Sequence, residues 1–240
     1  MHEQLILLPG WAFGPAALQP LCEALTELVP DLEVFIEPLP ELDDADAWLE
    51  ELDRRIPHDS WLCGWSLGGM LATQLAARRV DTCHGLITIA SNLCFRARPQ
   101  WPEAMAADIF DAFHEAFRLD PEETLKRFRL LCSRGGYDPR TLARQLEVSQ
   151  TASAHGVLDA GLKLLADLDG RGALHGYFGP QLHLFAGGDA LVPAAACDAL
   201  RRWMPGIEAE LLTGASHALP LERADDVASA IAAFIRGRVE

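Results

Sequence analysis

The sequence predicts an α/β fold in which a mainly parallel sheet is flanked by helices. Short apolar runs of strand length alternate with stretches of helical periodicity, which is typical of such a fold. Half of the residues are apolar and 23% are charged, a composition typical of globular proteins. At 240 residues the chain is long enough for one large domain with a substantial core.

The first part of the predicted sheet comes from the N-terminal third of the chain. The apolar run over residues 4–8 predicts a strand, and the amphipathic stretch at 15–28 predicts the helix that follows it. The same alternation continues along the chain. It predicts strands at 32–37, 60–64 and 85–90, and helices at 43–55 and 67–79.

The alternation returns near the C-terminus after an interruption. There the sequence predicts strands at 181–186 and 208–212 and helices at 194–203 and 222–236. Residues 94–178 contain no clear strand, only helix-like stretches such as DIFDAFHEAF and PEETLKRFRLLC. An all-helical insertion in an alternating chain usually covers one end of the sheet. We therefore predict an α/β core over 1–93 and 179–240, with a helical lid over 94–178.

Charge and composition argue against several classes of protein. A formal net charge of −15 disfavours general affinity for nucleic acid or anionic membranes. The longest apolar runs, such as LILL and LITIA, fall far short of the roughly 20 residues that cross a bilayer. The N-terminus lacks the basic region and cleavage site of a signal peptide. The six cysteines show no metal-ligand spacing, so we expect reduced thiols, no metal and a cytoplasmic location.

The stretch WLCGWSLGG places Gly-x-Ser-x-Gly between a predicted strand and a predicted helix. A strand that reverses sharply into a helix crowds the residues two before and two after its apex, where Gly64 and Gly68 carry no side chain. Ser66 would then stand above the sheet as a nucleophile. The backbone N–H of Leu67, at the helix start, would face a developing oxyanion. A purely structural turn is the alternative.

A serine nucleophile needs a general base that is itself oriented by a carboxylate. His217 lies in TGASHALPLE, a loop of small residues between the last strand and the last helix, and is the candidate base. His84 and His183 are better explained by strand packing. Asp189, in the glycine-rich loop GGDALVP after a strand, is the candidate acid. Its alternative role as a helix cap fits poorly, because it lies four residues before Pro193.

A second oxyanion donor is expected from the loop after the first strand. In LILLPGWAFG, Gly10 permits close backbone approach, and the N–H of Trp11 would join that of Leu67. The Trp11 indole would shape the acyl pocket. Many hydrolases carry His-Gly in this loop, whereas this chain has Pro9 in the histidine position.

Five segments together resemble the pimeloyl-(acyl-carrier protein) methyl ester esterases, α/β-hydrolases of biotin biosynthesis. They are LLPGWAFGPAAL, LCGWSLGGMLATQLA, SNLCFRARPQWPEAM, FAGGDALVP and GASHALPLERADD, and the resemblance covers nearly the full chain. It implies a serine carboxylesterase that converts the methyl ester of pimeloyl-acyl carrier protein to pimeloyl-acyl carrier protein and methanol without a cofactor. It places the triad on Ser66, Asp189 and His217, and the oxyanion donors on the backbones of Trp11 and Leu67.

The resemblance also implies that the lid binds the acyl carrier protein. Over residues 124–146 six basic residues face one carboxylate, so this stretch is locally positive, and acyl carrier proteins are acidic. The family uses lid arginines to hold the carrier and its phosphopantetheine. Arg127, Arg140 and Arg144 match such positions, and the last two are four residues apart on one helix face. Glu123 replaces a further arginine of that set, and a solvated helix face is the alternative interpretation.

Other functions stay open on the sequence alone. The triad does not recognise the acyl group, so a broad-specificity carboxylesterase or thioesterase of the same fold is the nearest alternative. A non-catalytic receptor on a hydrolase scaffold belongs to another class, and the complete Ser-Asp-His set argues against it. Haloperoxidase-like enzymes and carbon–carbon bond hydrolases share the triad and are less favoured. We expect a monomer without nucleic-acid or membrane partners.

Overall fold

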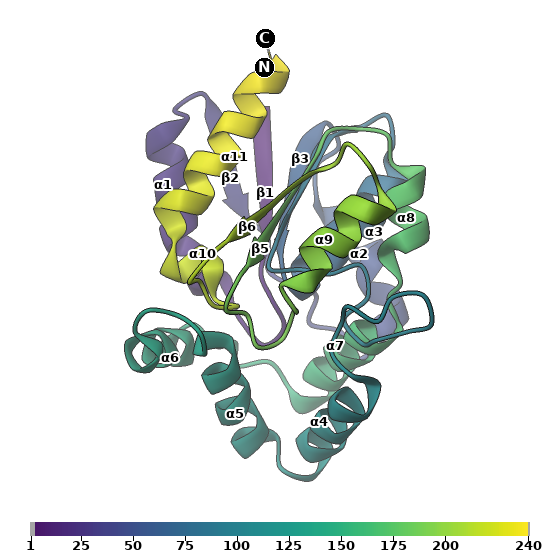
Figure 1. Cartoon of the computed structure of the whole chain (residues 1–240), viewed down its shortest axis with the longest axis vertical. Coiled ribbons are helices and arrows are strands. Elements are labelled where there is room, and N and C mark those ends of the chain that lie inside the picture. The colour runs from purple at the N-terminus through teal and green to yellow at the C-terminus, as the bar shows by residue number, and fades with distance from the viewer. Residues whose placement is uncertain (1–2, 240) are drawn as a thin grey trace.

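One sheet of six strands organises the chain, of which the computed structural model describes residues 3–239 (Figure 1). The strands lie in the order β2-β1-β3-β4-β5-β6, and every neighbouring pair is parallel. The parallel α/β sheet predicted from the sequence is therefore confirmed. The strands are β1 (Glu3–Leu8), β2 (Leu32–Ile36), β3 (Ser60–Trp65), β4 (Cys83–Ile89), β5 (Gln181–Ala186) and β6 (Glu208–Leu212).

Helices cover both faces of the sheet (Figure 1). On one face lie α1 (Gln19–Leu28) and α11 (Ala224–Val239), which pack against each other. On the other face lie α2 (Trp48–Arg55), α3 (Leu67–Arg78), α8 (Gly170–Gly176) and α9 (Ala195–Trp203). This two-sided cover explains why every residue of β3 and β5 is buried, whereas exposed and covered residues alternate along the edge strand β2.

Two predicted helices begin with a separate 3₁₀ turn in the structure, and the last one starts at Ala224, two residues later than predicted. The stretch predicted as a helix at 15–28 begins with a 3₁₀ turn, η1 (Pro15–Ala17), and α1 then starts with Pro20 in its first turn, where the missing N–H is not needed. The stretch at 43–55 begins with η2 (Ala45–Ala47), because Asp44 accepts a hydrogen bond from the Asp46 N–H. The last helix follows a separate short helix, α10 (Leu219–Glu222).

Four further helices gather at the carboxyl ends of the strands (Figure 1). They are α4 (Ala107–Leu119), α5 (Pro121–Ser133), α6 (Pro139–Val148) and α7 (His155–Asp167). The fifth helix of the predicted lid, α8, packs along α3 beside the sheet instead. The division of the chain into core and lid stays a prediction, but α4–α7 lie where a lid would lie. No helix within residues 3–239 combines the length and apolarity needed to span a membrane.

Candidate active site

The turn between β3 and α3 holds Ser66 in a rare backbone conformation. Its φ of 56° and ψ of −118° lie outside the regions that non-glycine residues normally occupy. A Cβ atom at Gly64 would lie 2.2 Å from the carbonyl of Gly68, and one at Gly68 would lie 2.4 Å from the carbonyl oxygen of Leu8. Neither position can carry a side chain without moving the backbone. The two glycines therefore allow the turn to close and to present Ser66 at its apex.

Three side chains from separate loops form a continuous chain of hydrogen bonds. The Oγ atom of Ser66 lies 2.9 Å from Nε2 of His217, and Nδ1 of the same ring lies 2.7 Å from Oδ2 of Asp189. Ser66 is 4% exposed, His217 is fully buried, and the Asp189 side chain is 1% exposed. This is the geometry of a nucleophile, a base and an orienting acid, which the sequence predicts for these residues.

The loop after β5 fixes the orientation of the Asp189 carboxylate. Its Oδ1 atom accepts hydrogen bonds from the backbone N–H groups of Leu191 at 2.7 Å and Val192 at 2.9 Å. The other oxygen is thereby aimed at His217. The N-cap of α9 is Ala194, without a side-chain cap, so the structure does not support the alternative role of Asp189 as a helix cap.

The loop after β6 carries His217 and is held from two sides. The Trp65 indole donates a hydrogen bond of 2.8 Å to the His217 carbonyl oxygen. The Glu222 carboxylate accepts hydrogen bonds from the backbone N–H of Ser216 at 2.8 Å and from its hydroxyl at 2.7 Å. The residue beside the imidazole is thus fixed through its backbone and its side chain. The sequence analysis did not single out Glu222.

The loop after β1 approaches Ser66 closely. A Cβ atom at Gly10 would lie 3.3 Å from the Ser66 Cβ, so glycine permits this approach. The Phe13 N–H donates to the Gly10 carbonyl at 3.2 Å and closes a turn in which Ala12 has a φ of 65°. Within residues 3–239, neither the Trp11 nor the Leu67 backbone N–H has a protein acceptor. Both donors are therefore free to meet an oxyanion.

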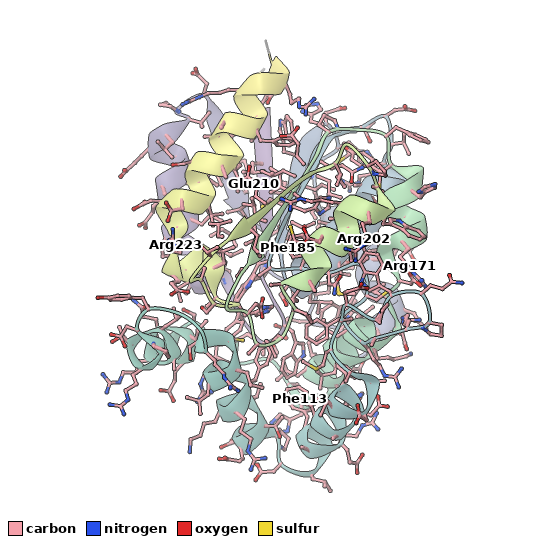
Figure 2. The ribbon with its side chains drawn as sticks, viewed as in Figure 1. Phe113, Arg171, Phe185, Arg202, Glu210 and Arg223 are labelled. Carbon is pink, nitrogen blue, oxygen red and sulfur yellow. The ribbon has the colours of Figure 1, made fainter. Side chains whose placement is uncertain are left out.

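The Trp11 side chain lies among aromatic side chains of α4 and α5. Its indole is 1% exposed and donates a hydrogen bond of 2.8 Å to the Leu158 carbonyl. It meets the rings of Phe113, Phe117 and Phe128 edge-on. Figure 2 labels Phe113, a residue of α4, between α4 and α5 below the sheet. An apolar cavity of about 50 Å³ adjoins the indole, and its lining includes Phe95, Phe110, Leu162 and Leu191.

The other histidines discussed from the sequence stand apart from this site. His183 is buried in β5, its Nδ1 atom lies 2.7 Å from the Thr88 hydroxyl, and burial lowers the pKa of its imidazole to about 3. It is a neutral packing residue, as the strand pattern predicts. His84 lies at the start of β4 and is partly exposed.

The three predicted lid arginines differ in their surroundings. Arg127, on α5, lies 3.4 Å from Glu123, which also lies 3.7 Å from Lys126. Arg140 and Arg144 are exposed on α6, and neither forms an ion pair with a carboxylate in the described part of the chain. The positive charge estimated for 124–146 is partly neutralised from just outside that range. Among the described residues, the basic residues of this stretch without an ion pair are Arg134, just after α5, and Arg140 and Arg144 on α6.

The fold and the site define a class of protein. A model of the alpha/beta hydrolase family matches residues 5–230, and the chain belongs to that family. The esterase from Exiguobacterium antarcticum has the same fold, with a TM-score of 0.83, 16% identity, and coverage of 98% of this chain and 92% of that one.

Curated relatives place the chain more narrowly. The pimeloyl-(acyl-carrier protein) methyl ester esterase of Aromatoleum aromaticum is 34% identical over 98% of this chain and 99% of its own length. The biotin biosynthesis bifunctional protein BioHC of Cellvibrio japonicus is 36% identical over 96% of this chain, but only 47% of its own length is covered. The chain thus spans about half the length of the bifunctional relatives. The resemblance to these esterases expected from the sequence is confirmed.

Proposed function

We propose that this chain is a serine carboxylesterase of biotin biosynthesis. It hydrolyses the methyl ester of a pimeloyl group carried on an acyl carrier protein and releases methanol. The observation that supports this most directly is the hydrogen-bonded chain of Ser66, His217 and Asp189 at the carboxyl ends of the strands. The substrate is inferred from the name of the relatives, pimeloyl-(acyl-carrier protein) methyl ester esterase.

The reaction consists of two acyl transfers through Ser66. Its Oγ attacks the ester carbonyl while Nε2 of His217, 2.9 Å away, accepts the hydroxyl proton. Asp189 holds the ring by its Nδ1 atom and stabilises the imidazolium. His217 then protonates the departing methoxide. Water attacks the acyl-enzyme in the second half, with His217 again as base.

Two backbone donors stabilise the oxyanion in each half. The N–H groups of Leu67 and Trp11 carry no protein acceptor and flank the nucleophile from two loops. Losing one such donor typically lowers kcat by ~10²–10³. The apolar cavity beside the Trp11 indole accommodates methylene groups of the acyl chain, because its lining side chains are aromatic or aliphatic.

The carrier docks on the helical lid formed by α4–α7. Arg140 and Arg144 offer two exposed charges on α6 to an acidic carrier and its phosphopantetheine. Arg127 contributes less, since Glu123 already pairs with it. The enzyme acts as a monomer in the cytoplasm, a compartment that keeps thiols reduced, and all six of its cysteines are free. Because Ser66 and His217 are buried, the acyl chain enters when the lid opens.

The test compares two substrates and two sites. The wild-type chain should hydrolyse the carrier-bound pimeloyl methyl ester with a higher kcat/KM than p-nitrophenyl butyrate. Ser66→Ala should lower kcat for both substrates by several orders of magnitude. Arg140→Glu with Arg144→Glu should lower kcat/KM only for the carrier-bound ester. Equal preference for the free ester, insensitive to the charge reversal, would instead identify a broad-specificity carboxylesterase.

The same proposal has a cellular test. The chain should restore biotin-independent growth to bacteria that lack their own pimeloyl esterase, and the Ser66→Ala variant should not. Labelling of the wild-type protein by a fluorophosphonate probe, lost in Ser66→Ala, locates the nucleophile. Failure of the wild-type chain to react with the probe would favour a non-catalytic receptor.

A further inference from the structure

Helix α6 is attached at both of its ends to loops of the candidate active site. Just before it, the Tyr137 backbone N–H donates a hydrogen bond of 2.8 Å to Oε1 of Glu222. Just after it, the Ser149 carbonyl accepts a hydrogen bond of 2.9 Å from the Gly14 N–H. We propose that α6 is a brace that sets the geometry of two catalytic loops, with Glu222 and the Thr151 backbone N–H as its positioning groups. This inference rests on the proposed esterase function.

At the first end, one carboxylate joins the lid to the histidine loop. Oε1 of Glu222 accepts from Tyr137, while Oε2 accepts from the N–H and the hydroxyl of Ser216. Ser216 is fully buried and directly precedes His217. A Cβ at Gly136 would lie 2.5 Å from Oε1, so only glycine there lets the carboxylate reach the lid backbone. Glu222 thus transmits the position of the lid to the residue next to the base.

A second contact strengthens this end. The Ala218 N–H, on the other side of His217, donates to the carbonyl of Cys132 at the end of α5, at 3.2 Å. The lid also touches the acid loop, since a Cβ at Gly135 would lie 2.0 Å from the Gly188 carbonyl oxygen. The end of α5 and the connection to α6 are therefore linked to both sides of His217, directly at Ala218 and through Glu222 at Ser216, and they approach the acid loop at Gly188.

At the second end, the segment after α6 pairs with the oxyanion loop. Gly14 N–H donates to Ser149, and the Thr151 N–H donates to the Ala12 carbonyl at 3.0 Å, which forms an antiparallel bridge around Phe13 and Gln150. Ala12 has a φ of 65°, a conformation that an alanine adopts only when its surroundings hold it there. The Trp11 N–H belongs to the same turn. Its direction thus depends on a bond from the lid.

The placement of the two links distinguishes a brace from a simple cover. A cover needs only apolar contact with the core, whereas each of these links ends on the backbone beside a catalytic group. Glu222 acts through Ser216 on His217, and Thr151 acts through Ala12 on Trp11. The helix between the links carries Arg140 and Arg144, so the carrier-binding helix of the proposed function is also the brace.

The first test uses Glu222→Ala and Glu222→Gln, assayed with p-nitrophenyl butyrate. Misplacing the base without removing it should lower kcat about 10- to 100-fold with KM nearly unchanged. Glu222→Gln should fall between Ala and wild type, because its single amide oxygen can accept from only one of the two sides. Thermal unfolding measured on each variant gives the folded fraction. A folded Glu222→Ala variant with wild-type kcat, or a loss explained by unfolded protein, would overturn this end of the brace.

The second test addresses the oxyanion loop and needs a matched pair. Thr151→Pro removes the N–H that bonds to Ala12, whereas Thr151→Ala keeps it, and both lose the same hydroxyl contact with Ser153. The kcat of the Pro variant should be about 10-fold below that of the Ala variant. Equal kcat values would refute this end. If Thr151→Pro does not fold, the Glu222 series decides the proposal alone.

The outcomes separate the brace from the proposed function. If the wild-type enzyme hydrolyses the free ester without preference for the carrier-bound ester, the proposal of a carrier-bound substrate is wrong. The Glu222 and Thr151 variants would still test the brace in that case. A wild-type chain that hydrolyses neither ester would sink both. Preference for the carrier-bound ester with unchanged kcat in Glu222→Ala, and equal kcat in the Thr151 pair, would sink only the brace.

Discussion

The serine turn and the helices that cover it are held by different forces. In the turn, backbone approaches backbone so closely that a Cβ at Gly64 would lie 2.2 Å from a carbonyl group. In the cover, formed by α4–α7 and the segment before them, side chains make many of the connections, beside the backbone hydrogen bonds at Cys132, Ser149 and Thr151. The Arg98 guanidinium caps the end of α7 through the carbonyls of Ala166 and Asp167, both at 2.6 Å, and Arg96 pairs with Asp111 of α4 at 2.7 Å.

This difference has consequences for how each region responds to change. Steric exclusion does not depend on pH or salt, so the turn keeps one geometry until the core unfolds. Ion pairs that are partly exposed weaken with salt and with protonation. The part of the attachment of the cover that these pairs supply therefore weakens gradually as salt is added or as the pH falls. On the proposed function, the region that opens for substrate and the region that holds the nucleophile would each use the interaction suited to its task.

The largest predicted effect follows from substituting a glycine of the turn. Gly64→Ala places a methyl group 2.2 Å from the Gly68 carbonyl, which only a backbone shift at Ser66 can relieve. We expect kcat for p-nitrophenyl butyrate to fall at least ~10²-fold and the free energy of unfolding to fall by about 3 kcal/mol. Urea unfolding and steady-state kinetics measure both. Wild-type kcat in this variant would show that the turn is not sterically locked.

The second prediction concerns pH and the buried core histidine. Because burial lowers the pKa of His183 to about 3, the unfolded chain, with a pKa near 6.5, binds a proton over a range where the native chain does not. This contribution to stability is complete above pH 6.5 and is lost progressively as the pH falls toward 3. We expect it to remove ~2 kcal/mol between pH 7 and 5, at ~1.4 kcal/mol per pH unit below 6.5.

His183→Gln supplies the control for this prediction. Glutamine does not titrate and can keep a hydrogen bond to Thr88, so its urea-unfolding free energy should fall less between pH 7 and 5 than that of the wild type. The carboxylates are common to both proteins and cancel in the difference. Parallel pH dependence in the two proteins would mean that His183 takes up its proton in the native state.

The strands of the core and the convergence of Ser66, Asp189 and His217 could be predicted from the sequence because both follow from short local patterns, whereas the catalytic role of the three residues stays a prediction. Ser66, Asp189 and His217 each follow a strand, and the carboxyl ends of parallel strands meet at one edge, so short motifs suffice to bring them together. The close approach at Gly64 and Gly68 follows in the same way from the spacing of one motif.

The contacts that attach the cover to the core could not be predicted from short sequence motifs. Two of these contacts join residues that are far apart in the chain, Glu222 with Tyr137 and Thr151 with Ala12. Each uses a backbone N–H group, which is present in almost every residue and therefore gives no signal in the sequence. The charge estimate for 124–146 missed its neutralisation because Glu123 and Glu147 lie just outside that range. Long-range polar contacts depend on how helices dock, which local periodicity does not determine.

A third prediction tests the graded attachment of the cover. Asp159 on α7 accepts hydrogen bonds from His114 at 2.8 Å and Arg118 at 3.3 Å, both on α4. Burial alone would raise the pKa of Asp159, but these two partners outweigh it and hold the pKa below its ordinary value. The contribution to stability is therefore present above the ordinary carboxyl pKa and is lost as the pH falls below it.

Asp159→Asn should lower the free energy of unfolding at pH 7 by about 0.5–1 kcal/mol, because the side chain is 38% exposed and the pair is screened. Limited proteolysis should cut the region of α4–α7 faster in the variant. At pH 3 wild type and variant should converge. A difference in stability that persists undiminished at pH 3 would show that shape, not charge, explains the effect of the substitution.

The smallest predicted effect is a gain in stability, from a second glycine-to-alanine substitution that serves as the control for Gly64→Ala. Gly172 lies inside α8, its φ is outside the left-handed region, and a Cβ there would meet nothing within 4 Å. Gly172→Ala should therefore raise the free energy of unfolding by ~0.5–1 kcal/mol and leave kcat unchanged. The substitution is chemically identical to Gly64→Ala, but it is made in a helix and not in a strand, and the added methyl group meets open space and not a carbonyl. If Gly172→Ala were as destabilising as Gly64→Ala, the steric account of the serine turn would fail, and a general cost of replacing glycine would explain both.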